Sequence, residues 1–162
     1  MFKSKVLKVC AVLAVVFAGA VRLPAAEEVK LTAEEVQIRS IYANSMTKAI
    51  AKGASFSGKQ VSPEQQAEIR RIVNEAFPEI LATVKRAGLY EEYKAQMFDP
   101  ELRSLDERAM AAKDMGEVMS IARQQMAVVQ KKYPELFKWM NSNKELQAVV
   151  SAMMQKIIAV LK

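Results

Sequence analysis

Helix-start signals recur along this sequence, and they limit what the chain can fold into more than any other feature. Thr32 is followed by Glu35, and Ser62 is followed by Pro63 and Gln65. A hydroxyl residue followed three positions later by Glu or Gln is a capping box, in which both side chains bond free backbone N–H groups. Proline directly after the cap strengthens the signal, because its φ angle suits the first helical position. The same logic predicts helix starts at Asp99-Pro100-Glu101, at Pro134 and at Ser142-Asn-Lys-Glu145.

Between these signals the apolar residues recur three and four positions apart, which is helical spacing. The predicted helices cover about residues 33–52, Ser62 to Pro78, a stretch from there to Gly88, a short stretch ending near Met97, residues 100–132, a turn after Pro134, and residues 143–161. Gly53 and Gly88 are expected just beyond helix ends, where a left-handed residue is common. No run alternates with a period of two for long enough to form a strand. The sequence therefore predicts an all-α protein, a compact bundle of about five to seven helices.

The N-terminal segment has the features of a secretory signal peptide. Lys3, Lys5 and Lys8 precede thirteen apolar or small residues, 9–21, and small residues follow. Thirteen residues rise only about 20 Å as a helix, whereas a membrane core needs about twenty apolar residues. Cleavage after Ala26 is favoured over cleavage after Ala20. We therefore expect a signal peptide over 1–26, a single helical domain over 27–162, and export to a periplasm or the exterior, with no membrane-spanning helix left after cleavage.

Composition excludes several classes of chemistry. The chain has no histidine, and Cys10 is its only cysteine. Catalysis by imidazole, His-ligated or Cys-clustered metals and disulfide frameworks are therefore excluded, and no motif for a catalytic, cofactor-binding or metal-binding residue is found. We predict a protein that is not an enzyme and has no cofactor.

The charge balance of the expected mature chain gives no reason to predict a nucleic-acid partner. Four of the 24 basic residues and none of the 18 acidic residues lie in 1–26, which leaves 20 basic and 18 acidic residues and a net charge of +2. A nucleic-acid-binding domain needs a concentrated basic face. We therefore expect no nucleic-acid partner.

Methionines are the candidate functional residues. Seven of the ten lie between Met110 and Met154, and Met115, Met119 and Met126 share one helical face. The face is either part of the core, which we favour for Met119 with partial exposure toward Met110 and Met126, or a pliable surface for apolar partners, because methionine adapts to varied shapes. A copper(I) thioether site is a further alternative. With the only tryptophan as an anchor, the candidate apolar binding surface comprises Met110, Met115, Met119, Met126, Trp139 and Met140.

Two short segments resemble a known family. Leu31-Thr-Ala-Glu-Glu35 and Val61-Ser-Pro-Glu-Gln65 are each followed by Ile-Arg, and they resemble the repeated Leu-Thr-x-x-Gln element of the Spy and CpxP periplasmic stress proteins. This sequence departs from that element at Glu35 and at Val61-Ser62. The stretch Phe98-Asp-Pro-Glu-Leu102 is also similar to uncharacterised exported helical families. The first resemblance implies a chaperone-like role or a role as an envelope stress adaptor.

The function that we predict from the sequence is non-covalent binding of other polypeptides or envelope components in an apolar groove between helices. One alternative is a structural partner subunit that buries its methionines in an oligomer, including a homo-oligomer. Another is a glycan-cleaving enzyme that uses carboxylates alone, which would need two carboxyl groups facing each other about 5–9 Å apart. A large groove would favour binding, a flat apolar patch would favour assembly, and a carboxylate-lined cleft would favour the enzyme.

Overall fold

The computed structural model describes residues 30–162, and this part of the chain folds into helices with no strand. The predicted signal peptide, 1–26, lies outside the described residues. The helices are α2 (Ala33–Ser55), α3 (Pro63–Arg86), α4 (Tyr90–Met97), α5 (Pro100–Ala111), α6 (Met115–Lys132), α7 (Pro134–Ser142) and α8 (Lys144–Val160). The predicted all-α bundle of five to seven helices is confirmed.

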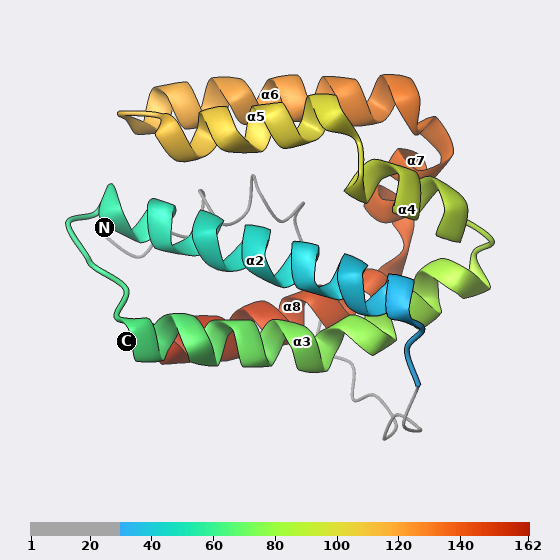
Figure 1. The fold of residues 1–162 in the computed structure, drawn as a ribbon, viewed down its shortest axis with the longest axis horizontal. Coiled ribbons are helices and arrows are strands. Elements are labelled where there is room, and N and C mark those ends of the chain that lie inside the picture. The colour runs from blue at the N-terminus through green and yellow to red at the C-terminus, as the bar shows by residue number, and fades with distance from the viewer. Residues whose placement is uncertain (1–29) are drawn as a thin grey trace.

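The long helices run roughly along one direction in three tiers (Figure 1). Helices α3 and α8 lie side by side, α2 covers them, and α5 and α6 form an antiparallel hairpin on the far side of α2. The two short helices, α4 and α7, lie together at one end of the molecule, where the chain enters and leaves the hairpin. The hairpin is therefore joined to the rest of the molecule mainly through this end.

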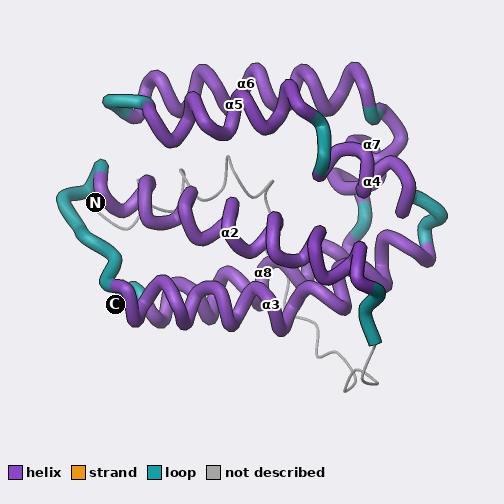
Figure 2. The backbone as a smooth tube through the Cα atoms, in the orientation of Figure 1, coloured by secondary structure: helices purple, strands orange, loops and turns teal. Residues whose placement is uncertain are grey.

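The helix starts follow the predicted caps, and only short loops join the helices (Figure 2). Thr32 Oγ1 and Ser62 Oγ each accept a hydrogen bond from the N–H three residues on, at 3.2 Å, and both capping boxes are complete. Asp99 Oδ1 accepts from the N–H groups of Glu101 and Leu102 at 2.8 and 3.1 Å. The last helix is capped by Asn143 instead of the predicted Ser142.

The predicted interruption at Pro78 is wrong, because α3 runs through it without a break. Proline lacks an N–H and removes one intrahelical hydrogen bond, which disfavours a helix interior. Its neighbours on both sides, Phe77, Ile80 and Leu81, are all buried in the core. Helical stability in proteins comes largely from packing of the apolar face, so this burial outweighs the local cost.

The predicted long helix over 100–132 is also wrong, because residues 112–114 break it into α5 and α6. Asp114 caps α6 by accepting a hydrogen bond from the Glu117 N–H at 2.9 Å, and Glu117 accepts one from the Lys113 N–H at 2.9 Å. The break lets α6 fold back on α5. Folding back buries Leu105 of α5 and Ile121 of α6 together, which a single straight helix cannot do.

Gly88 ends α3 as predicted, with φ of +72°, but Gly53 does not end α2. Gly53 is buried inside that helix, which continues to Ser55. The left-handed glycine is Gly58, with φ of +71°. The extension places Phe56 where it packs against the hairpin core.

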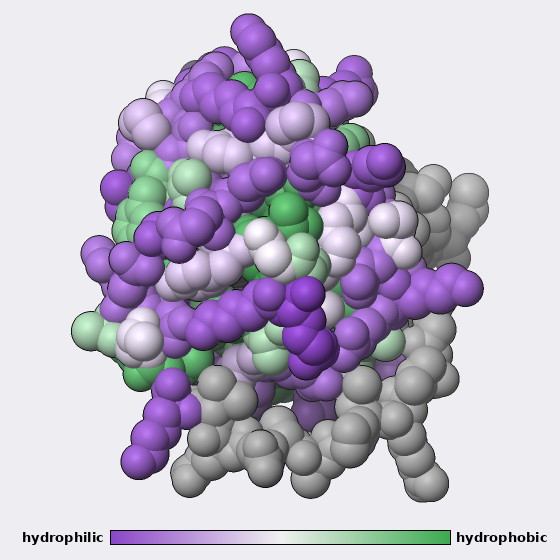
Figure 3. All heavy atoms as spheres, turned by 90° about the vertical axis from the view of Figure 1, so that its right-hand side faces the viewer, coloured by the Kyte–Doolittle hydropathy of each residue, from purple (hydrophilic) through white to green (hydrophobic). Residues whose placement is uncertain are grey.

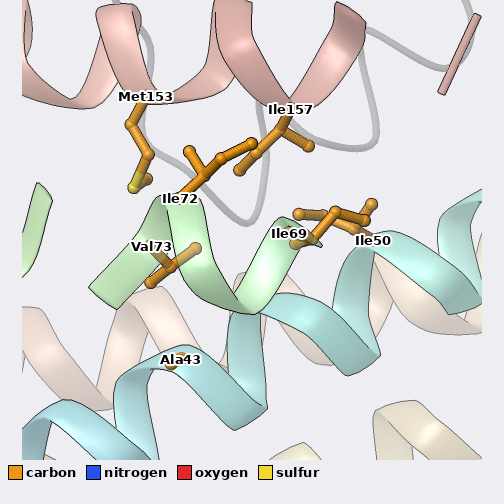
Figure 4. Close-up of a cluster of buried hydrophobic side chains, with 7 residues drawn as sticks. All are labelled: Ala43, Ile50, Ile69, Ile72, Val73, Met153 and Ile157. Carbon is orange, nitrogen blue, oxygen red and sulfur yellow. The ribbon is translucent and has the colours of Figure 1, made fainter. Parts of the chain in front are cut away.

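The main core lies where α2, α3 and α8 meet. Figure 4 shows Met153 and Ile157 of α8 pointing toward α3, with Ala43 and Ile50 of α2 on the opposite side of α3. A second cluster, centred on Phe77 and Leu81, joins α2 and α3 to the short helices α4 and α7. This second cluster fixes the end of the molecule to which the hairpin is attached.

Candidate binding groove

A groove opens between α2 and the α5–α6 hairpin and is closed at one end by α4 and α7. Its volume is about 570 Å³, within the range of roughly 300–1,000 Å³ that is usual for ligand sites. All seven described helices contribute to its lining. The groove is therefore a product of the whole fold and of no single element.

The lining is mainly apolar. On α2, Ile38 and Ile50 are buried in the core, whereas Ile41, Met46 and Ala49 are half-buried and line the groove. The apolar stripe of α2 is thus divided between the core on one side and the groove on the other. Such a division is possible because the apolar stripe of α2 is broader than the surface that the core covers, so part of the stripe faces the core and part faces the groove.

Four methionines and the only tryptophan surround the groove. Met46 comes from α2, Met97 from α4, Met126 from α6, and Trp139 and Met140 from α7. Methionine side chains are flexible and polarisable, so they adapt to partners of different shape. This lining is suited to apolar ligands that vary in shape.

The structure divides the six residues of the predicted binding surface into two groups. Met126, Trp139 and Met140 line the groove, whereas Met110, Met115 and Met119 do not. Met110 packs against the hairpin core. Met115 and Met119 are half-buried on α6 away from the groove.

The methionine face of α6 does not share a single environment, and Met126 is partly exposed as expected. Ala122 and Val129 are buried, whereas Met126 between them is 39% exposed. Met119, which we expected in the core, is only half-buried. The helix lies across the boundary between the hairpin core and the groove, so residues on one face meet different neighbours.

The closed end of the groove depends on a long-range helix cap. The first turn of α7 has no cap from its own sequence, because Tyr133 makes no capping hydrogen bond. Instead, Glu92 of α4 accepts a hydrogen bond from the Leu136 N–H of α7 at 3.2 Å. A carboxylate at a helix N-terminus also interacts favourably with the helix dipole. The contact holds together the two helices that carry Met97 and Trp139.

A buried carboxylate fixes the base of the hairpin. Asp99 Oδ2 accepts hydrogen bonds from Lys132 Nζ at 2.9 Å and from Tyr133 Oη at 2.8 Å, while Oδ1 caps α5. Burial by itself would raise the pKa of Asp99, but the hydrogen bonds from Lys132, the backbone and Tyr133 outweigh it and lower the pKa to about 2. The start of α5 is thereby tied to the end of α6.

Two residues of α4 that line the groove, Tyr93 and Gln96, each have a buried polar atom without a partner. Tyr93 is 4% exposed, and among residues 30–162 neither its hydroxyl nor the buried Oε1 of Gln96 has a hydrogen-bond partner. Burial raises the pKa of Tyr93 well above its ordinary value, so the hydroxyl keeps its proton at neutral pH. Buried polar groups without a partner are rare in folded proteins and each calls for an explanation.

Charged groups of both signs line the rest of the groove. Lys48 and Arg103 are the basic residues, and Asp106 and Glu107 are the acidic ones. The two carboxylates are neighbours on α5, where adjacent residues point in different directions and do not face each other. Asp106 also accepts a hydrogen bond from Gln125 at 2.6 Å. This is not the arrangement that carboxylate-only glycan cleavage requires.

Residues 30–162 hold no group of three or more His, Cys, Asp or Glu side chains placed to bind a metal ion. None of its helices is long and apolar enough to cross a lipid bilayer. On the face formed by α4 and α7, hydrophilic side chains predominate and hydrophobic ones show as small separate areas (Figure 3). The only large apolar side chains exposed among these residues are Val36 and Met126, so the apolar surface is recessed in the groove.

Comparison with known proteins gave no match: no family model fits the sequence, and no curated protein or solved structure is significantly similar to it. The groove itself is therefore the basis for a functional proposal.

Several groove residues were absent from the predicted surface: Met46, Met97, Tyr93 and Gln96. Met97 and Tyr93 are four residues apart and form the apolar face of α4, so the sequence indicated that they share a side. No sequence signal indicated that this side meets α2 and α6 at a groove. Gln96 could have been noticed only as a polar residue beside that apolar face.

Proposed function

We propose that the protein is an exported binding protein that holds apolar segments of other polypeptides non-covalently in the groove between α2 and the α5–α6 hairpin. The observation that carries the proposal is the methionine-rich apolar lining of a groove of about 570 Å³. Adaptable methionines favour a site for varied segments over one shaped for a single ligand. A chaperone-like role in the envelope is the corresponding biological function.

The shape of the surface supports binding more than the two alternatives. An assembly subunit would be expected to expose a broad apolar patch, but Val36 and Met126 are the only large exposed apolar residues among 30–162. A carboxylate enzyme would need acids on opposite walls, whereas Asp106 and Glu107 are neighbours on one helix.

Trp139 makes the proposal directly testable, because the only tryptophan of the chain lines the groove. Titration with a short leucine-rich peptide is expected to shift its fluorescence in a saturable way. The protein is also expected to reduce aggregation of a chemically unfolded client. If the protein does neither, the chaperone-like role is wrong and the assembly hypothesis becomes the better one.

Two methionines of α6 provide a matched pair of variants. Met126→Ala removes an exposed groove residue, so we expect peptide affinity to fall roughly fivefold, as for loss of about 1 kcal/mol of apolar contact, with little change in stability. Met119→Ala lies outside the groove and should leave affinity unchanged while lowering stability by about 1 kcal/mol. Equal effects of both substitutions on affinity would contradict the assignment of the groove.

A further inference from the structure

The α5–α6 hairpin has a small core of its own. Its buried apolar residues pack against one another and form a cluster separate from the main core: Leu105, Ala109, Ala112, Val118 and Ile121. Of the half-buried residues packed against this cluster, Phe56 alone comes from outside the hairpin. The hairpin therefore buries most of its apolar surface internally and shares little of it with the helices across the groove.

The polar contacts of the hairpin are internal as well. Arg108 of α5 donates a hydrogen bond to Gln124 of α6 at 3.3 Å, and Gln125 of α6 donates one to Asp106 of α5 at 2.6 Å. Within residues 30–162, no hydrogen bond or ion pair joins α5 or α6 to α2, α3 or α8. Movement of the hairpin away from α2 would thus break no polar contact between these helices.

The two connections at the base of the hairpin are short and lie together. Phe98 and Asp99 join α4 to α5, and Tyr133 alone joins α6 to α7. Tyr133 Oη donates a hydrogen bond to Asp99 Oδ2 at 2.8 Å, which holds the two connections side by side. Hinges commonly consist of a few residues at the ends of elements, where backbone angles can change. The hairpin can turn about this pair while its own core stays intact.

Phe56 holds the opposite end of the hairpin. Figure 1 shows the end of α2 and the turn between α5 and α6 at the end of the molecule opposite α4 and α7. Phe56 is seven residues, or about 10 Å, beyond Ala49, the last residue of α2 that lines the groove. Lys52 Nζ lies 5.1 Å from the centroid of its ring, a cation–π contact that favours this position of the ring.

We infer that the α5–α6 hairpin is a lid over the groove, which turns about Asp99 and Tyr133 and is held closed at its free end by Phe56. Elements with few apolar contacts to the rest of a protein open at a lower free energy than global unfolding requires. The inference goes beyond the proposed function, because any occupant of the groove would be admitted in the same way. Opening also lets the groove accept a segment bulkier than its closed volume of about 570 Å³.

Single cysteines report on the movement of the lid without any ligand. Ala122 of α6 lines the groove, is 3% exposed and does not belong to the hairpin cluster, so Ala122→Cys places a thiol that opening uncovers. Ala43 is buried in the main core (Figure 4), so the thiol of Ala43→Cys is reached only by global unfolding. Ala148→Cys on α8 is a second core reporter. Each reporter is placed in a Cys10→Ser chain, where it is the only thiol.

The experiment measures the rate at which iodoacetamide labels each thiol, by intact mass, in native buffer and in low urea. We expect the thiol at position 122 to react faster than those at 43 and 148, and more slowly than in the unfolded chain. Its rate should change little with urea, because opening exposes little surface, whereas the core thiols should react faster as urea rises. Phe56→Ala should speed labelling at position 122 at least tenfold, because it removes the contact that keeps the lid closed.

Two conservative substitutions are the matched controls. Ile157→Val weakens the main core and Ile121→Val weakens the core of the hairpin. Ile157→Val should speed labelling at position 43 severalfold through global unfolding. Both should leave the rate at position 122 within about twofold, because the main core and the hairpin core stay packed when the lid turns.

Four results would overturn the inference. Equal rates at positions 122 and 43 would mean that only global unfolding uncovers the groove. A rate at position 122 equal to that of the unfolded chain would mean that nothing covers the site. No effect of Phe56→Ala would exclude its role, and a severalfold effect of Ile121→Val at position 122 would show that the hairpin unfolds instead of turning. None of these results depends on a peptide, so they are separate from the test of the proposed function.

Discussion

At the scale of single residues, Asp99 illustrates how one side chain can combine a local and a tertiary role. Its position before Pro100 predicts a helix cap, and Oδ1 indeed caps α5. The other oxygen binds Lys132 and Tyr133, more than thirty residues away. The cap could be predicted because its partners are the next residues in the sequence. The contact of Asp99 with Lys132 and Tyr133, which we call the clamp, could not be predicted, because it depends on α6 returning to the start of α5.

The lowered pKa of Asp99 predicts a loss of stability in acid. The folded-state pKa is about 2 and the ordinary value is 3.8, so the stabilisation is fully present above about pH 4 and is lost as the pH falls through about 2. Because Lys132 is partly exposed, we expect a contribution of about 1–2 kcal/mol. Urea unfolding of the wild-type protein and Asp99→Asn between pH 2 and 6 measures it. The difference in unfolding free energy between them should shrink toward low pH, and a constant difference would contradict the clamp.

Asp99→Ala and Ser62→Ala separate the cap from the clamp. Ser62 caps α3, and among residues 30–162 its Oγ forms hydrogen bonds only within the first turn of that helix, so its loss should cost about 1 kcal/mol. Asp99→Ala also leaves Lys132 and Tyr133 without their shared partner, so we expect a larger cost, about 2–3 kcal/mol. Urea midpoints at neutral pH measure both. Equal costs would mean that the clamp adds nothing to the cap.

At the scale of helices, local signals identified where elements begin better than where they end. Thr32, Ser62 and Asp99 all cap helices as predicted, since a cap needs only its own first turn. The predictions that were wrong concern whether a helix continues or is interrupted. A proline inside α3 and a break between α5 and α6 were each decided by which apolar residues could be buried together, and that depends on distant parts of the chain.

The continuity of α3 predicts that Pro78→Ala stabilises the protein. Alanine restores an N–H that can bond the Asn74 carbonyl, and proline is disfavoured in a helix interior by about 3 kcal/mol relative to alanine. Loss of proline's restraint on the unfolded chain offsets part of this gain. We expect a net increase in unfolding free energy of about 1–2 kcal/mol, measured by urea denaturation.

Pro63→Ala is the control for this substitution. Pro63 occupies the first position of α3, where the N–H would have no intrahelical partner. Its replacement should change stability by less than about 0.5 kcal/mol. A decrease in stability with Pro78→Ala would show that the helix depends on the proline and that our explanation of its continuity is wrong.

At the scale of the whole molecule, the groove results from the return of the α5–α6 hairpin over α2. The hairpin is held at its base by Asp99 and at its other end by Phe56, and the space between these contacts is the groove. Tyr93, Gln96 and Met97 line it from a short helix, α4, which Glu92 holds against α7. The site therefore depends on contacts among elements far apart in the chain.

Export is a prediction about the whole molecule that the N-terminal sequence makes by itself. Three lysines precede thirteen apolar or small residues, so the mature protein is expected to begin between Val21 and Glu28. Intact-mass analysis of the protein from the periplasmic fraction of a bacterial host measures this. A mass that includes residues 1–20 would contradict cleavage, and recovery only from the cytoplasm would contradict export.

The sequence by itself determined the all-α class and most helix starts. These features depend on composition and on residues close together in the chain, and such interactions form in the same way whatever the rest of the fold does. It also indicated the methionines as candidate functional residues, but not which of them lie together on one surface. Only the tertiary structure placed Met46, Met97, Met126 and Met140 around one groove and left Met119 outside it. The physical reason is that every described helix contributes to the groove, so its lining depends on how the helices pack against each other, which helical spacing within one segment cannot specify.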